Sequence, residues 1–221
     1  MIRVLSVGPI GENVHIVENR AQPVVVVDPG AEPGRVLSET LAAVNRTGAP
    51  SVHVALTHGH LDHVAGLPGL LAGLSAAGVS VRVFAPEDDR PYFGVKAYET
   101  NERVFIDIHA ISFLKKFWTP IPDADVYFSD GYTLPGTDIR VIHTPGHTPG
   151  SSCFLAEGGT QLITGDTLFQ GGRGRTDTFD ADEKTLLRSI DERLLTMDDA
   201  VRVWPGHGGQ TTLGRERHNY R

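Results

Sequence analysis

The 221-residue chain is poor in cysteine, in long apolar runs and in positive charge, and each shortage excludes a class of protein. The single Cys153 rules out an internal disulfide and is typical of a reducing compartment. No stretch reaches the roughly 18 apolar residues that cross a membrane, and Met1 to Ile10 does not resemble a signal peptide. The formal net charge of −7 argues against a nucleic-acid partner, because phosphate backbones need a basic face. We therefore expect a cytoplasmic globular protein with no nucleic-acid and no membrane partner.

Short runs rich in β-branched residues alternate with Gly- and Pro-rich turns along most of the chain. They predict strands, with helical segments expected at 35–44, 63–77 and 183–195. The expected strands are 2–7, 14–17, 24–27, 52–56, 81–85, 139–142, 152–156, 161–164 and 201–204. No linker interrupts this pattern. The sequence therefore predicts one α/β domain, residues 1–221, made of two similar halves.

Residues 88–132 have a different composition and are interpreted as an insertion within this domain. They hold ten of the sixteen aromatic residues, and much of 96–117 is compatible with a helix. Two interpretations stay open. The aromatic side chains belong to the core or to a subunit contact, which would make a homodimer, or the segment is a cap that supplies an apolar substrate pocket.

Histidine and aspartate residues follow several predicted strands, and they are most concentrated in His58-Gly59-His60-Leu61-Asp62-His63. Loops aimed by a rigid sheet are where sites usually lie, so a polar surface loop is the weaker interpretation. A catalytic zinc takes three protein ligands, and seven candidates therefore suit two metals that share a carboxylate. The seven candidates are His58, His60, Asp62, His63, His147, Asp166 and His207.

In this order, the motifs resemble the metal-ligand motifs of the metallo-β-lactamase superfamily. The motifs are His58-x-His60-x-Asp62-His63, His147 in Thr-Pro-Gly-His-Thr-Pro-Gly, Asp166 in Thr-Gly-Asp-Thr-Leu-Phe, and His207 in Pro-Gly-His-Gly. The resemblance implies a four-layer αββα sandwich with two metals at one edge. It assigns His58, His60 and His147 to the first metal, Asp62, His63 and His207 to the second, and Asp166 to both.

The resemblance also implies a chemistry and its supporting residues. A hydroxide between two divalent metals would attack a carbonyl, with Asp62 and Asp166 as the catalytic carboxylates. Zinc is the first expectation, and iron or manganese accepts the same ligand types. Asp28, in Asp-Pro-Gly, and His143, close to the second motif, are expected to orient the ligands without touching the metals.

Within the superfamily, residues 165–177 and the Pro-Gly-His-Gly motif resemble the glyoxalase II-like group, which hydrolyses thioesters such as S-lactoylglutathione. In the eukaryotic type a Lys and a Tyr hold glutathione, and the aligned residues in this chain are Arg175 and Asp177. The chain is therefore more similar to the short bacterial type. Arg175 is expected to bind an anionic acyl-thiol substrate, whose carrier need not be glutathione.

Three other activities on the same fold are weighed against this one. A mono-iron persulfide dioxygenase shares the Gly-Arg-Thr-Asp element, but it carries a Cys in the Gly-rich loop, where this chain has Gly172-Arg173-Gly174. A lactonase shares the metal chemistry and fits an apolar cap. A β-lactamase is less expected, because the most familiar group uses a Cys as a second-metal ligand.

Overall fold

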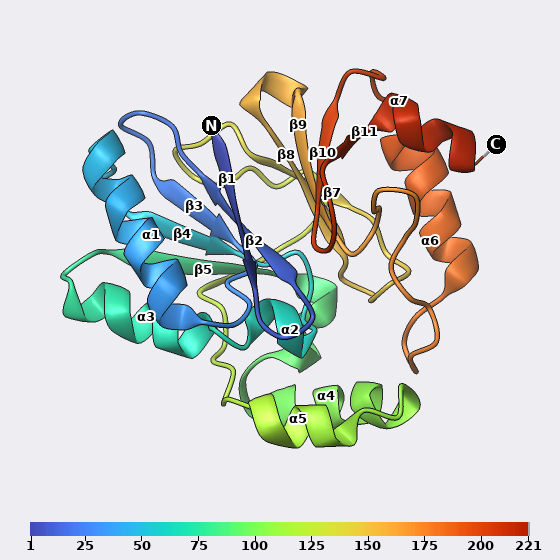
Figure 1. Ribbon diagram of the computed structural model, residues 1–221, viewed down its shortest axis with the longest axis horizontal. Coiled ribbons are helices and arrows are strands. Elements are labelled where there is room, and N and C mark those ends of the chain that lie inside the picture. Colours follow the sequence, from blue (N-terminus) through green and yellow to red (C-terminus); the bar gives the residue numbers. More distant parts are fainter. Residues whose placement is uncertain (221) are drawn as a thin grey trace.

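The strands form two facing β-sheets, in the computed structural model of residues 1–220 (Figure 1). The first sheet has the order β1-β2-β3-β4-β5-β6 and the second the order β11-β10-β9-β8-β7, so each half of the chain builds one sheet. The last residue of the expected domain, 221, lies outside the described residues. The strands are β1 (Ile2–Val7), β2 (Glu12–Val17), β3 (Val24–Val27), β4 (Val52–Ala55), β5 (Val81–Pro86), β6 (Val126–Phe128), β7 (Arg140–His143), β8 (Ser152–Ala156), β9 (Gln161–Gly165), β10 (Arg202–Pro205) and β11 (Thr211–Thr212).

Three apolar cores separate four layers of secondary structure. One core lies between the first sheet and helices α1 (Pro33–Thr47) and α3 (Leu67–Ala76), one between the two sheets, and one between the second sheet and α6 (Glu183–Ser189). Strand β3 shows why its sequence is an unbroken run of valines. Val24 and Val26 belong to the helix-facing core and Val25 and Val27 to the core between the sheets, so both faces are buried. The predicted αββα sandwich is confirmed.

Two predicted helices are broken. The segment 63–77 consists of α2 (Leu61–Val64) and α3, because Gly66 N donates to the carbonyl of Gly30 instead of to the preceding helical turn and Pro68 has no N–H to donate. The segment 96–117 consists of α4 (Ala97–Asp107) and α5 (Ile111–Phe117), which His109 separates with a φ of 55°. The segment 183–195 begins as α6 and continues as the π-helical turn η4 (Ile190–Leu194). The remaining α-helix is α7 (Leu213–Glu216). Within residues 1–220, none of the helices is long and apolar enough to cross a membrane.

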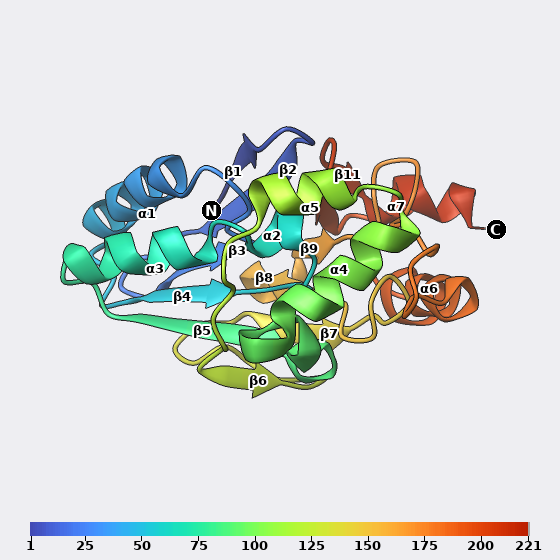
Figure 2. The ribbon, with the colours of Figure 1, turned by 90° about the horizontal axis from the view of Figure 1, so that it is seen from below.

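The aromatic-rich segment forms a cap and also contributes to the core. Helices α4 and α5 lie across one end of the sandwich, as Figure 2 shows from below. Tyr92, Phe93 and Phe128 are buried, and β6 is a strand of the first sheet that pairs with β5. The helical cap is therefore shorter than the expected insertion 88–132.

Candidate metal centre

The seven candidate ligands meet at one end of the sandwich, close to the cap. Five of them lie in loops that begin where β4, β7, β9 and β10 end, and the other two, Asp62 and His63, lie on α2. The two sheets are joined at this end, since Ser152 donates its N–H to the carbonyl of Thr57 at 2.9 Å. The parallel and antiparallel pairing of the strands thus brings together loops that are distant in sequence.

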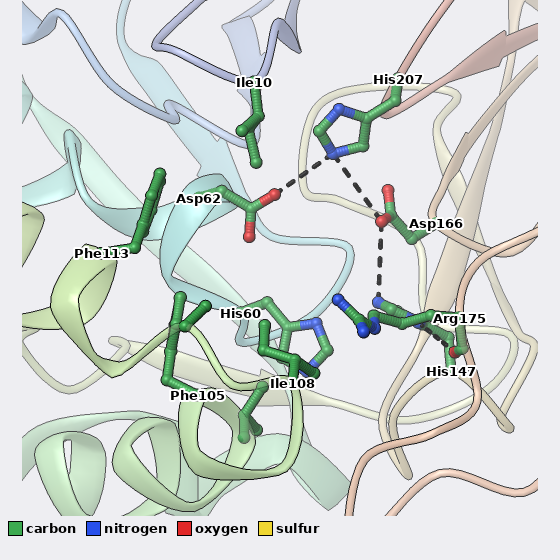
Figure 3. A pocket seen from close by; sticks show the side chains of 12 residues that line it. Ile10, His60, Asp62, Phe105, Ile108, Phe113, His147, Asp166, Arg175 and His207 are labelled. Carbon is green, nitrogen blue, oxygen red and sulfur yellow. Dashed lines mark hydrogen bonds and ion pairs between the residues drawn. The ribbon is translucent and has the colours of Figure 1, made fainter.

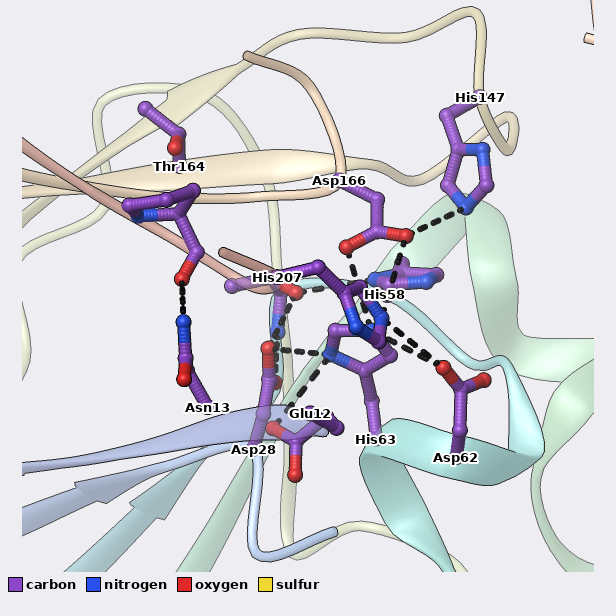
Figure 4. Close-up of polar contacts among 12 residues, drawn as sticks. Glu12, Asn13, Asp28, His58, Asp62, His63, His147, Thr164, Asp166 and His207 are labelled. Atoms are coloured by element: carbon purple, nitrogen blue, oxygen red, sulfur yellow. Dashed lines mark hydrogen bonds and ion pairs between the residues drawn. The ribbon is translucent and has the colours of Figure 1, made fainter. Parts of the chain in front are cut away.

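The ligand atoms form two groups with a carboxylate between them. One group is His58, His60 and His147 and the other is Asp62, His63 and His207; in each, the ligand atoms lie within 4.8 Å of one another. These are the two sets that the resemblance implies. Asp166 reaches both, with Oδ1 3.2 Å from His63 Nε2 and Oδ2 3.7 Å from His147 Nε2 (Figure 4).

Unpartnered buried atoms test whether this arrangement fits metal ions. Five ligand atoms are buried, and none of them has a hydrogen-bond partner within residues 1–220. They are the Nε2 atoms of His58, His60, His63 and His147, and Oδ1 of Asp166, whose 3.2 Å contact with His63 is an ion-pair contact. Buried polar atoms are almost always paired, because an unpaired one costs about 1–3 kcal/mol. Imidazole nitrogen and carboxylate oxygen are ligands that zinc, iron and manganese accept. The residues therefore fit two divalent cations.

Asp28 orients the imidazoles of His58 and His63 through their Nδ1 atoms, on the side of each ring away from the ligand atom Nε2. Its Oδ2 lies 2.9 Å from His63 Nδ1 and accepts the hydroxyl hydrogen of Thr57 at 2.6 Å. The Thr57 oxygen is then free to accept from His58 Nδ1, 2.9 Å away. Both rings thus carry their hydrogen on Nδ1 and direct the Nε2 lone pair toward the centre. Asp28 has a left-handed φ of 52°, a strained conformation of the kind that clusters at functional sites.

The protonation states differ between the two ligand groups. Burial lowers the pKa of His60 to about 3 and the pKa of His58 well below its ordinary value, so both imidazoles are neutral. Burial lowers the pKa values of His63 and His207, but the carboxylates of Asp62 and Asp166 outweigh this and hold both pKa values above their ordinary values, so a metal would displace a proton from these imidazoles. Burial raises the pKa of Asp166, but the imidazoles of His63, His147 and His207 together outweigh this and hold the pKa below its ordinary value. Neutral imidazoles and an ionised carboxylate are the forms that bind a metal.

His143 lies apart from this centre. Its Nε2 is 2.9 Å from the carbonyl oxygen of Pro149 and 3.6 Å from Asp88 Oδ2, and it lines a separate small cavity. In the described part of the chain, none of its hydrogen bonds or ion pairs reaches a candidate ligand. The contacts of His143 therefore give no support to the orienting role expected for it, and that role stays a prediction.

Asp89, which the sequence analysis missed, joins the ligand loops of the two halves. It is fully buried in the 3-10 helix η1 (Glu87–Tyr92). Oδ2 accepts from Gly59 N at 2.9 Å and from Thr148 Oγ1 at 2.8 Å, and Oδ1 accepts from Gly150 N at 2.6 Å. Gly59 lies between two ligands of the first group, and Thr148 follows the third. Burial raises the pKa of Asp89 to about 7.

Asn13, on β2, has a similar position beside the second group. Its Nδ2 donates to the carbonyl oxygens of Pro205 at 3.0 Å and Gly208 at 2.9 Å, on either side of the ligand His207. The Asn13 side chain therefore fixes this loop against the first sheet.

We expect Asn13→Ala to weaken binding of one metal equivalent by about 10- to 100-fold, the usual effect of removing a residue that supports a ligand. Titration of metal-free protein with zinc would measure it. Asn101→Ala, which removes another buried asparagine from the cap, is the control and should bind zinc like the native protein. Equal affinities of native protein and Asn13→Ala would contradict the role of Asn13.

A cavity of about 280 Å³ opens onto the ligands. Figure 3 shows apolar side chains such as Ile10, Phe105 and Phe113 on one side and Arg175 on the other. The backbone carbonyl of Arg175 also lies 2.8 Å from His147 Nδ1. Helices α4 and α5 thus supply an apolar wall to this cavity, and its use as a substrate pocket stays a prediction. The residues that line the cavity are Ile10, His60, Asp62, Val104, Phe105, Ile108, Ala110, Phe113, His147, Asp166, Arg175 and His207.

Comparison with known proteins agrees with this geometry. Over 99% of its length, and 95% of the relative's, the chain is 29% identical to hydroxyacylglutathione hydrolase GloC of Haemophilus influenzae. It is similar to the crystal structure of the BLEG-1 B3 metallo-beta-lactamase, with a TM-score of 0.81 and 26% identity over 99% of this chain and 97% of that one. It is similar to TTHA1623 in a di-iron-bound form, with a TM-score of 0.76 and 34% identity over 98% of both chains. Because the model of the metallo-beta-lactamase superfamily matches residues 7–207, which include all seven candidate ligands, the chain belongs to that superfamily.

Proposed function

We propose that this metallo-hydrolase cleaves thioesters made of a carboxylic acid and an anionic thiol carrier, in the manner of glyoxalase II. One observation carries the proposal: both ligand groups, the Arg175 side chain and an apolar wall line the same cavity. The relation to GloC supports a thioester substrate, and the relation to a di-iron-bound protein supports a two-metal site in which iron is an alternative to zinc.

Each part of the site has a distinct task in this reaction. Two divalent cations, when bound, supply an activated water and a Lewis acid for the carbonyl. Asp62 and Asp166 are the two carboxylates at the centre, and Asp28 keeps the imidazoles of His58 and His63 in the productive orientation. The apolar side chains of the cap exclude bulk water, which strengthens electrostatic interactions in the cavity.

Arg175 is proposed to bind a carboxylate of the thiol carrier. Its side chain is 44% exposed, and its guanidinium donates to both oxygens of Asp177, at 2.7 and 2.8 Å. A carboxylate of the carrier offers the same planar pair of acceptors and would take the place of Asp177.

We expect Arg175→Ala to raise KM for S-lactoylglutathione about tenfold with little change in kcat, because a charge-assisted contact remote from the carbonyl contributes uniform binding. Asp177→Asn, which weakens the ion pair that competes with the substrate for Arg175, should lower KM for S-lactoylglutathione. Arg173→Ala is the matched control, because Arg173 pairs with Glu183 and does not line the cavity. Steady-state kinetics would measure all three, and an unchanged KM in Arg175→Ala would refute the role of Arg175.

A substrate panel tests the proposed function itself. The panel contains S-lactoylglutathione, an acyl-homoserine lactone, a chromogenic cephalosporin, and glutathione persulfide with an oxygen electrode. We expect thioester cleavage to have the highest kcat/KM. The similarity to BLEG-1 makes β-lactam hydrolysis the second candidate, and cleavage of the cephalosporin with the thioester intact would replace our proposal by it.

A further inference from the structure

A second cavity, of about 270 Å³, adjoins the one that contains the ligands. Three residues line both cavities and so form the boundary between them: Ile10, from the turn between β1 and β2, Phe113, from α5, and the ligand Asp62. The far walls of the second cavity include the side chains of Val7, Ala31, Leu61, Ala65 and Phe117. The second cavity therefore begins at the candidate metal centre and leads away from it between the first sheet and the cap.

The interior of this cavity offers little to an anionic ligand, because its charged lining residues are the carboxylates Glu12, Glu32 and Asp62. Both oxygens of Glu12 are buried without a hydrogen-bond partner within residues 1–220, and Oε1 lies 3.9 Å from His63 Nδ1. Glu32 is half-exposed, accepts from Gly8 N at 2.9 Å and pairs with Arg35 at 3.3 Å. None of the described residues that line this cavity is Lys, Arg or His, so an anionic group that entered would lose its hydration without gaining a counter-ion. The cavity therefore fits a hydrocarbon chain.

The position of Arg175 decides which part of a substrate enters the second cavity. Arg175 lines the first cavity and not the second, whereas Asp62 lines both. A thioester whose carbonyl carbon lies at the ligand groups extends in two directions from it. The anionic carrier is drawn to Arg175, so the other arm, the acyl chain, extends past Ile10 and Phe113.

We propose that the second cavity is the acyl-chain subsite, and that the preferred substrates are thioesters of apolar, medium-length carboxylic acids. The inference rests on the proposed thioester hydrolysis and adds the class of acyl group to it. A short hydroxyacyl group such as lactoyl leaves this cavity unfilled.

Acyl thioesters of one thiol, from acetyl to butanoyl to octanoyl, test the subsite. Each methylene of the acyl chain that enters the second cavity should raise kcat/KM of the native protein roughly fourfold. Ala31→Leu, which fills the cavity without touching a ligand, should lower the octanoyl-to-acetyl ratio of kcat/KM at least about tenfold. Phe117→Ala, which enlarges the cavity, should raise the ratio of kcat/KM for an added dodecanoyl thioester to that for the octanoyl thioester. Ala72→Leu, the same change on the exposed face of α3, is the control.

Binding of octanoate and acetate to the metal-loaded protein, measured by calorimetry, separates this inference from the proposed function. Tighter binding of octanoate that Ala31→Leu weakens supports the subsite. Thioester cleavage with no dependence on chain length, together with equal affinity for both acids, overturns the subsite and leaves the hydrolase standing. Selective octanoate binding without cleavage of any thioester keeps the apolar subsite and overturns the thioesterase.

Discussion

Asp166→Ala is expected to hydrolyse the best thioester of the panel at least about a thousandfold more slowly than the native protein. Asp166 is the carboxylate between the two ligand groups, 3.2 Å from His63 Nε2 and 3.7 Å from His147 Nε2. Without it, the two groups have no shared ligand. Metal sites of this kind supply several kcal/mol of transition-state stabilisation, and each 1.36 kcal/mol corresponds to tenfold in rate.

Elemental analysis should accompany the rate measurement. We expect two metal equivalents per chain in the native protein and fewer in Asp166→Ala. Asp191→Ala, at an exposed position on η4, removes a carboxylate elsewhere and should retain both metals and full activity. Full activity in Asp166→Ala would refute the two-metal mechanism, and a single iron equivalent in the native protein would favour the dioxygenase.

Asp89→Ala is expected to lower the free energy of unfolding by on the order of 4 kcal/mol. Of the three donors that lose this acceptor, Gly59 N and Gly150 N are left unsatisfied, at about 1–3 kcal/mol each, whereas Thr148 Oγ1 can donate to Ser151 Oγ, 2.8 Å away. Asp89→Asn should lose less, because its amide oxygen can still accept from two of the three donors.

Urea denaturation of the metal-free proteins would measure these differences, so that lost metal affinity does not contribute to them. The neighbouring Asp88, whose side chain is 61% exposed, provides the control variant Asp88→Ala. If Asp89→Ala is as stable as Asp88→Ala, Asp89 does not join the two loops in the way its hydrogen bonds indicate. Weakened zinc binding in the folded Asp89→Ala variant would show that the same carboxylate also positions the ligands His58, His60 and His147.

The candidate ligands could be predicted from the sequence because metal chemistry restricts both residue type and spacing. Few side chains can replace the imidazoles of His58 and His60, and short strands deliver them to one edge of a sheet. Asp89 and Asn13 act instead on backbone N–H and C=O groups, which every residue carries, so their partners leave no pattern in the sequence. The second cavity is likewise lined by residues from separate elements, so no local pattern in the sequence predicts it.

Non-local contacts also explain where the predicted secondary structure differs. The helix expected at 63–77 is interrupted because Gly66 N donates to the carbonyl of Gly30, a residue distant in sequence, and because Pro68 cannot donate to the preceding turn. The run of four valines in β3 predicted a strand correctly, because burial on both faces requires no alternation. Patterns confined to one element were thus sufficient to predict strand β3, whereas the contact between Gly30 and Gly66 that interrupts the helix was not foreseen.

The division of the ligands between the two sheets couples metal binding to the closure of the sandwich. Each ligand group takes two residues from the first half of the chain and one from the second, His147 in one group and His207 in the other. A cation held by either group would therefore act as a cross-link across the seam between the halves. By thermodynamic linkage, bound ions would stabilise the docked halves by RT ln(1 + [L]/Kd) for each site, and neither half alone contains all three residues of either ligand group. Metal supply would then regulate the lifetime of the folded protein as well as its turnover.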